Sequence, residues 1–289
     1  MNSILSIDYC ENRLGISLSH GQIRVYTSTD LEEFVFLSDL KVPPQEVLKW
    51  NGETMATGSC DGDINMLQFI PKTGLLVIRC SQNIHKDIIK DIIYRHDIIY
   101  TCSIDNYVNI LRLSIDSDYF SLIRINKVQA HNGWVTGFAL LNDLLLSQGS
   151  DNTYTIWKGF EMKKIAQLKY TKEEHSYSLI SKPNAGHEWF LLADTQSQID
   201  GDACVTAFHS KTFQIVEISL YTSPIHSQND VIKENRLANT HMQVQCSVFT
   251  ENGFIVAASN WILFYSLPKF IIRDEYQIDS NSEINVIPN

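Results

Sequence analysis

The chain has 289 residues, of which 44% are hydrophobic, 10% aromatic and 19% charged. This composition is typical of a globular protein and excludes a disordered or fibrous chain. The formal net charge is -10 and no run of Lys and Arg occurs, so we expect no direct contact with nucleic acid. A single core is near its size limit at this length unless the chain is built from repeated pieces.

The cysteine pattern and the length of the apolar segments indicate where in the cell the protein is located. The six cysteines are scattered without a CxxC pair, so we expect neither a disulfide partner nor a zinc knuckle. They are Cys10, Cys60, Cys80, Cys102, Cys204 and Cys246. The N-terminus lacks the basic start and long apolar centre of a signal peptide, and the most apolar window, 261–272, is too short to span a bilayer as a helix. We therefore expect a cytoplasmic protein with no membrane insertion.

Taken in chain order, strand-like runs begin at residues 3–9 and then recur in longer units. Residues 46–67, 87–111 and 134–157 share one order: a run, a turn, a second run, an Asp-containing turn and a third run. Within these runs the apolar residues alternate with a period of two, and helical spacing does not persist. Each unit is therefore predicted to be an antiparallel meander of strands.

The residue that ends the third strand of each unit sets the repeat length. These residues are Tyr26, Leu67, Leu111, Trp157, Phe208 and Tyr265, separated by 41, 44, 46, 51 and 57 residues. The first intervals are close to the roughly 40 to 45 residues of a four-stranded propeller blade. The sequence thus predicts an all-β fold, a β-propeller of four-stranded antiparallel blades. Six blades are favoured, or seven if the long fifth and sixth intervals hide another.

We expect a single propeller domain over residues 1–289. Its blades are predicted at residues 1–40, 41–78, 79–125, 126–170, 171–222 and 223–276, followed by a tail at 277–289.

The fourth unit carries residues that resemble the WD-repeat family. In that family a His precedes the first strand, a Ser or Thr lies in the second, an Asp in the tight turn and a Trp in the third. His131, Ser147, Asp151 and Trp157 are similar in type and spacing. The resemblance implies a structural tetrad, in which the Asp orients the imidazole and its other nitrogen engages the hydroxyl and then the indole.

The remaining units keep only parts of this tetrad, so the resemblance is strong in the middle third of the chain and weak at both ends. The matching residues are His85, Thr101 and Asp105 in the third unit, Thr57 and Asp61 without a His in the second, His20 in the Asp position of the first, and His175 and His241 ahead of the first strands of the fifth and sixth.

Closure of the ring is the next question that the sequence raises. Because residues 3–9 already form the first strand of the first blade, we expect no N-terminal segment to complete the last one. The tail at 283–287 is one candidate edge strand, and a strand or blade supplied by a partner is another. Open six-bladed propellers of vesicle-coat and nuclear-pore scaffolds, which this chain resembles in blade count and order, use the partner route.

The sequence carries no local signature of catalysis. GxSxG, GxxxxGK[ST] and GxGxxG are all missing from it, so we predict neither an enzyme nor a cofactor. The text His187-Glu188-Trp189 lacks the second His of a zinc-binding helix, so we expect a loop there and no metal site.

Because the faces of the blades are buried against one another, only the rims and edges of the propeller are free to bind. We expect them to bind one or more protein partners. The main hypothesis is a non-catalytic scaffold of a multiprotein complex, at a vesicle coat or nuclear pore. The text at residues 131–136 also resembles the opening repeat of the receptor for activated C kinase, which implies a ribosome-associated adaptor. Residues 129–131 with Trp134 are similar to a blade of the diphthine methylesterase family, but that family's Gly-Gly-x-Trp-Arg text is missing.

Trp134 and Asn132 are the candidate partner-binding residues. They follow His131, near the rim where propellers meet other proteins, and Trp is enriched at interface hot spots. The alternative for Trp134 is packing between blades.

Overall fold

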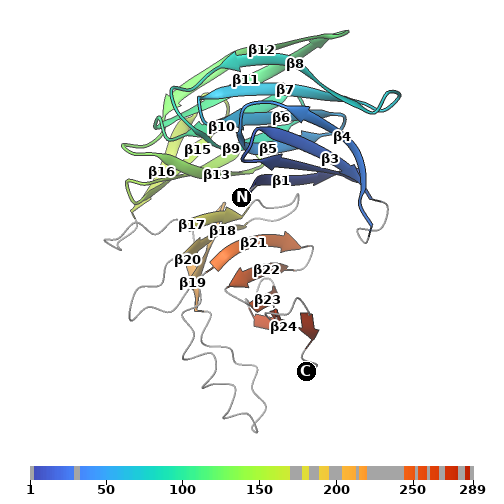
Figure 1. Cartoon of the computed structure of the whole chain (residues 1–289). Coiled ribbons are helices and arrows are strands. Elements are labelled where there is room, and N and C mark those ends of the chain that lie inside the picture. The colour runs from blue at the N-terminus through green and yellow to red at the C-terminus, as the bar shows by residue number, and fades with distance from the viewer. Residues whose placement is uncertain are drawn as a thin grey trace. The chain divides into compact units, whose positions relative to one another are not determined.

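The computed structural model describes residues 3–28, 33–169, 178–181, 189–194, 204–212, 215–219, 244–250, 253–258, 261–266, 271–278 and 284–286. The regular elements in these ranges are all β-strands, and they form six antiparallel sheets (Figure 1). This is the all-β architecture of four-stranded sheets that the sequence predicts. The chain divides into two compact units, residues 1–138 with 147–169 and residues 139–146 with 170–289, which are described separately.

The first three sheets belong to the N-terminal unit, and each is made of four consecutive strands. The first sheet has β1 (Ile4–Cys10), β2 (Arg13–Leu18), β3 (Gln22–Thr27) and β4 (Val35–Lys41). The second has β5 (Gln45–Asn51), β6 (Thr54–Ser59), β7 (Asp63–Ile70) and β8 (Leu75–Asn83). The third has β9 (Ile89–Arg95), β10 (Ile98–Ser103), β11 (Tyr107–Asp116) and β12 (Tyr119–Gln129).

The other three sheets follow the same order of strands. The fourth has β13 (Val135–Leu141), β14 (Leu144–Gly149), β15 (Thr153–Lys158) and β16 (Lys163–Lys169), and the fifth has β17 (Ser178–Ser181), β18 (Trp189–Asp194), β19 (Cys204–His209) and β20 (Ile215–Ser219). The sixth has β21 (Val244–Thr250), β22 (Gly253–Ala258), β23 (Trp261–Ser266), β24 (Ile271–Ile278) and β25 (Ile284–Val286).

The sixth sheet corrects the expectation that its last blade lacks a strand. Its four strands β21–β24 are consecutive in the chain, and the tail strand β25 pairs with β24 as a fifth. Residues 284–286 of the predicted tail strand therefore extend a sheet that already has four strands. The predicted blade boundaries at 78 and 125 also fall too early, because β8 ends at Asn83 and β12 at Gln129.

A repeated tight turn joins the second and third strands of the first four sheets. Each turn has one residue with positive φ, and these are Gly21, Gly62, Asn106 and Asn152. The carbonyl groups of the first three accept the backbone N–H groups of Val42, Ile84 and Ala130, which precede the next sheet. The turn thus fixes where the chain enters the next sheet.

The outer strands share a β-bulge. In five sheets the register shifts by one residue at an equivalent position of the third strand, namely at Tyr26, Leu67, Leu111, Trp157 and Tyr265. The strands β7 and β11 continue past Leu67 and Leu111, so these two residues do not end their strands as expected from the sequence. The extra residues are Leu37, Arg79, Ile125, Ile165 and Arg273. A bulge bends a strand and increases its local twist.

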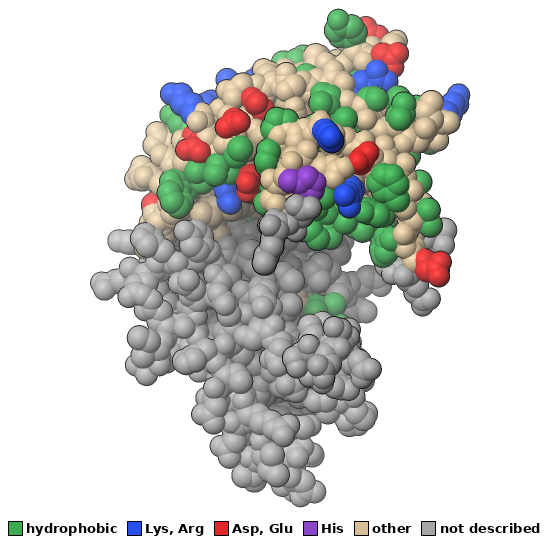
Figure 2. Space-filling view, in the orientation of Figure 1, with side chains coloured by type: hydrophobic (Ala, Val, Ile, Leu, Met, Phe, Trp, Pro, Cys, Tyr) green, Lys and Arg blue, Asp and Glu red, His purple; other side chains and the backbone are tan. Residues whose placement is uncertain are grey.

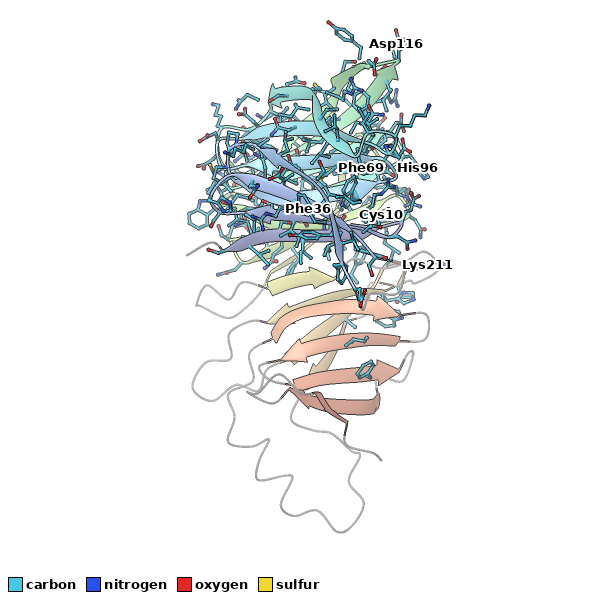
Figure 3. All side chains as sticks on the ribbon, turned by 45° about the vertical axis from the view of Figure 1, so that its right-hand side comes forward. Cys10, Phe36, Phe69, His96, Asp116 and Lys211 are labelled. Atoms are coloured by element: carbon cyan, nitrogen blue, oxygen red, sulfur yellow. The ribbon has the colours of Figure 1, made fainter. Side chains whose placement is uncertain are left out.

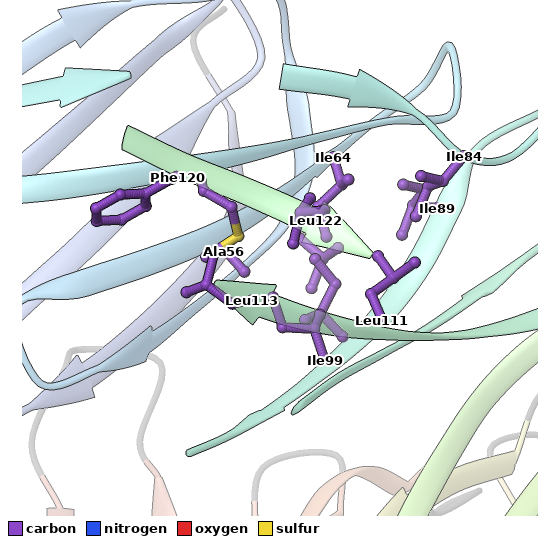
Figure 4. Packing of buried hydrophobic residues seen from close by; sticks show 12 residues of the cluster. Ala56, Ile64, Ile84, Ile89, Ile99, Leu111, Leu113, Phe120 and Leu122 are labelled. Carbon is purple, nitrogen blue, oxygen red and sulfur yellow. The ribbon is translucent and has the colours of Figure 1, made fainter. Parts of the chain in front are cut away.

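Hydrophobic side chains between neighbouring sheets form the core of the N-terminal unit. Contacts join the inner strands β1, β5 and β9 in turn, and the outer strands β4, β8 and β12. Figure 4 shows the cluster between the second and third sheets, which is Val47, Ala56, Ile64, Met66, Ile84, Ile89, Ile92, Ile99, Leu111, Leu113, Phe120 and Leu122. Burying one such Leu, Ile or Phe side chain contributes roughly 1.5–3 kcal/mol, so each sheet depends on its neighbour.

The hairpin of β11 and β12 is longer than the others, and Asp116 at its tip lies away from the body of the unit (Figure 3). Tyr119 beside it is 84% exposed. Arg79 of β8 forms a 2.8 Å ion pair with Asp118 in the same turn. An ion pair with so exposed a carboxylate adds little stability.

Candidate functional site

A chain of four hydrogen-bonded side chains crosses the fourth sheet. The Trp157 indole N–H donates to Ser147 Oγ at 2.8 Å, and Ser147 Oγ lies 2.8 Å from His131 Nε2. His131 Nδ1 lies 3.0 Å from Asp151 Oδ1. An indole N–H can only donate, so the Ser147 hydroxyl is free to donate to Nε2, and Nδ1–H then donates to the carboxylate. The geometry assembles the four residues that the WD-repeat resemblance brought together.

Asp151 also holds the loop that leads into the fourth sheet. Its carboxylate accepts the Asn132 N–H at 2.8 Å and the Thr153 hydroxyl at 2.7 Å. Burial alone would raise the pKa of Asp151, but these hydrogen bonds and the neighbouring His131 lower it below its ordinary value. Burial lowers the pKa of His131, against the opposing charge of Asp151. The pair therefore favours a neutral imidazole beside a carboxylate.

The third sheet repeats the arrangement without the indole. His85 Nδ1 lies 3.0 Å from both carboxylate oxygens of Asp105, and Nε2 lies 2.9 Å from Thr101 Oγ1. The backbone N–H groups of Lys86 and Tyr107 also donate to Asp105 at 3.0 Å. Burial would raise the pKa of Asp105, but the hydrogen bonds from His85 and these two amides lower it to about 2.

The second sheet departs from the prediction. Gln45, and not Asp61, is the partner of Thr57: its Oε1 accepts from Thr57 Oγ1 at 2.7 Å and from Asn65 Nδ2 at 3.0 Å. Its Nε2 donates to the Pro43 carbonyl at 2.7 Å.

Gln45 links these buried groups through a neutral amide. A carboxylate at this position would be buried without a cation or an imidazole beside it, because the second sheet has no His there. The sequence signal for Gln45 was a polar residue at the start of an apolar strand, directly after two prolines.

The other predicted positions contribute less. His20 is exposed and its Nε2 lies 3.1 Å from Gln22 Oε1, so the first sheet places no tetrad around it. His175, His241, His187 and Glu188 lie outside the described residues.

Trp134 is exposed on a loop whose backbone is held in place. Trp134 is 47% exposed, so it lies at the surface and is not packed between two blades. The Trp134 N–H donates to Ser150 Oγ at 2.8 Å, and the Ser150 N–H donates to the Trp134 carbonyl at 2.8 Å. Asn132, also exposed, is tied to Asp151 through its amide. Three hydrogen bonds thus fix residues 132–134 and leave both side chains at the surface.

The described ranges contain no group of three or more His, Cys, Asp or Glu side chains able to hold a metal ion. Cys10, Cys60 and Cys80 are free thiols. No helix with the length and hydropathy of a membrane span occurs in the part of the chain that the structure describes.

No protein-family model matches the sequence, and no curated protein matches it either. Solved structures do match. The WD40 β-propeller domain of Doa1 is 12% identical over 99% of this chain and 89% of that one, with a TM-score of 0.66. Saccharomyces cerevisiae Sqt1 is 11% identical over 94% of this chain and 73% of its own, with a TM-score of 0.70.

A computationally designed protein, Ika8, is 14% identical over 89% of this chain and 68% of its own, with a TM-score of 0.62. At these identities the three likenesses show the fold alone.

Proposed function

We propose that this chain, which has the fold of a WD40 β-propeller, is a non-catalytic protein-interaction scaffold that binds a partner through Trp134 and Asn132. The observation that carries the proposal is the exposed Trp134 on a loop held in place by Asp151, which in turn binds the buried His131. A rigid loop loses little conformational entropy on binding, and Trp is enriched among the residues that dominate binding energy.

The tetrads support a structural role for the polar residues in the sheets. His131 and His85 each have both ring nitrogens engaged by neighbouring side chains, and both rings are buried. Groups occupied in this way stabilise a turn and are not available to a substrate. The part of these two sheets that remains available to bind a partner is the surface loop at His131 and the one at His85.

The third sheet presents the loop at residues 85–88 in the same way. The Lys86 N–H donates to Asp105 as the Asn132 N–H donates to Asp151. Lys86 and Asp87 are exposed there. The two loops are held by the same contact, a backbone N–H donated to an Asp carboxylate, but they carry different side chains. Together they provide a surface that can recognise a specific protein.

The more specific proposal is a cytoplasmic subunit of a coat or pore complex. Each described sheet uses its own consecutive strands, so none of them needs a single strand from elsewhere to complete it. That organisation supports a propeller completed by a whole blade from a partner, and not by a single strand inside the sixth sheet.

Affinity purification with quantitative mass spectrometry tests the proposal. We expect the tagged wild-type chain to retain a defined set of proteins, and Trp134→Ala to lose at least one of them. Tyr119→Ala, which removes a more exposed aromatic side chain from the β11–β12 hairpin, is the matched control and should retain the full set. Identical protein sets for wild type and Trp134→Ala, with both variants folded, would contradict the role of Trp134.

A further inference from the structure

A second surface has a charge opposite to that of the whole protein. Residues 119–129 of β12 and 158–167 around β16 contain five basic and one acidic side chain, in a chain of net charge -10. The basic residues are Arg124, Lys127, Lys158, Lys163 and Lys164, and the acidic one is Glu161. Basic residues gathered in this way attract a negatively charged partner.

The two segments meet in the structure. Asn126 Nδ2 on β12 donates to the Phe160 carbonyl in the turn before β16 at 3.0 Å. Apolar side chains lie among the charges, since Ile123, Phe160 and Ile165 are between 40% and 57% exposed. Figure 2 shows hydrophobic, basic and acidic side chains interspersed on one face of the N-terminal unit. We call Arg124, Lys163 and Lys164 together with Ile123, Phe160 and Ile165 the outer basic surface.

In both strands the β-bulge lies directly after a basic residue and adds an apolar one. Arg124 pairs with Leu111 and is followed by the bulge residue Ile125, and Lys164 pairs with Trp157 and is followed by Ile165. These are equivalent positions of two successive sheets. Around the bulge of β16, Lys163, Lys164 and Ile165 are all exposed.

The charges of this surface are not neutralised locally. Within the described ranges, Arg124, Lys163 and Lys164 form no salt bridge, whereas Lys49 pairs with Asp8 at 3.0 Å. The Arg124 guanidinium donates weakly to the Ile84 carbonyl at 3.4 Å. Lys164 Nζ donates to Gln167 Oε1, so an incoming carboxylate would replace a neutral acceptor there and would not have to break an ion pair.

We propose that the outer basic surface binds an acidic segment of a partner protein that also carries apolar side chains. Exposed Ile123, Phe160 and Ile165 have no counterpart on a phosphate backbone, and the net charge of -10 opposes a long polyanion. This inference goes beyond the proposed function, because it assigns a second surface and the chemistry of its partner.

Fluorescence anisotropy with a short labelled peptide of Glu, Leu and Phe tests this surface. We expect saturable binding that weakens about tenfold when the salt concentration rises from roughly 50 to 300 mM, because exposed charges are screened. Lys163→Glu with Lys164→Glu should weaken binding at least about tenfold. Lys72→Glu with Lys90→Glu changes the net charge equally at exposed positions elsewhere and should change affinity less than about twofold.

Four outcomes would overturn the proposal: no binding of the peptide, equal binding of a peptide with Gln in place of Glu, equal loss in both double variants, or equal affinity for single-stranded RNA or phosphatidylserine vesicles. Self-association of the chain through Lys163 and Lys164, in place of peptide binding, would also overturn it. Thermal melts of each variant establish that it is folded. Trp134→Ala should leave the peptide affinity unchanged, so this test and that of the proposed function fail separately.

Discussion

The carboxylate of Asp151 accepts the backbone N–H of Asn132 at 2.8 Å, across 19 residues of sequence. This bond connects the buried tetrad of the fourth sheet to the loop that presents Trp134. Asp105 and Lys86 form the same connection in the third sheet at 3.0 Å. The side chain that stabilises the turn is therefore also the one that positions the surface loop.

Replacing Asp151 by Ala should destabilise the protein by about 2–3 kcal/mol, because His131 Nδ1–H and the Asn132 N–H both lose their acceptor. Differential scanning calorimetry would detect this as a lower Tm. Asp116→Ala, at the exposed tip of the β11–β12 hairpin, is the control and should melt like the wild type. A wild-type Tm for Asp151→Ala would refute the bracing role.

The repeat length predicted an all-β fold of four-stranded sheets. The WD-repeat resemblance, and not spacing alone, implied the pairing of His131 with Asp151 and the partial network of the third sheet, because the tetrad positions of that family lie at fixed distances from the turn. Gln45 could not be predicted in this way, because it occupies none of the tetrad positions of the family. Its side chain nevertheless binds Thr57 and the Pro43 carbonyl. The bulges were also missed, because they follow from sheet twist and not from a residue type.

Acid should destabilise the protein through Asp105. Its folded pKa of about 2 lies below the ordinary value, so the unfolded chain binds the proton more readily. The resulting stabilisation of about 2 kcal/mol is complete above roughly pH 5 and is lost as the pH falls through 4 towards 2. The lowered pKa of His131 also makes the protein less stable in acid, because the unfolded chain binds a proton at this residue more readily than the folded protein does.

Urea unfolding of wild type and Asp105→Asn between pH 7 and pH 3 measures this effect. Asn cannot titrate, so the difference in unfolding free energy between the two proteins should shrink as the pH falls. A difference that stays constant over this range would show that Asp105 does not contribute through its ionisation.

Gln45→Glu should destabilise the second sheet more at pH 8 than at pH 5. The ionised carboxylate would be buried beside Thr57 and Asn65 without a cation, which raises its pKa and makes the charged form costly. Gln45→Ala should cost about 1–3 kcal/mol at both pH values, because Thr57 and Asn65 lose an acceptor. Equal unfolding free energies for Gln45→Glu at the two pH values would contradict this interpretation.

Gly62→Ala should be more damaging than Gly52→Ala, although both glycines have positive φ, 84° and 61°. A Cβ at Gly62 would overlap the carbonyl oxygen of His85, which is the residue held by Asp105, whereas nothing lies within 4 Å of a Cβ at Gly52. Gly52→Ala should therefore cost only the strain of the left-handed backbone, about 1 kcal/mol.

For Gly62→Ala we expect that strain plus displacement of the loop at residues 85–88, because the Gly62 carbonyl also accepts the Ile84 and His85 N–H groups. Hydrogen exchange should then show faster exchange of the Lys86 amide, which donates to Asp105. Protection of that amide equal to the wild type, at a lowered Tm, would mean that the turn and the loop are not coupled.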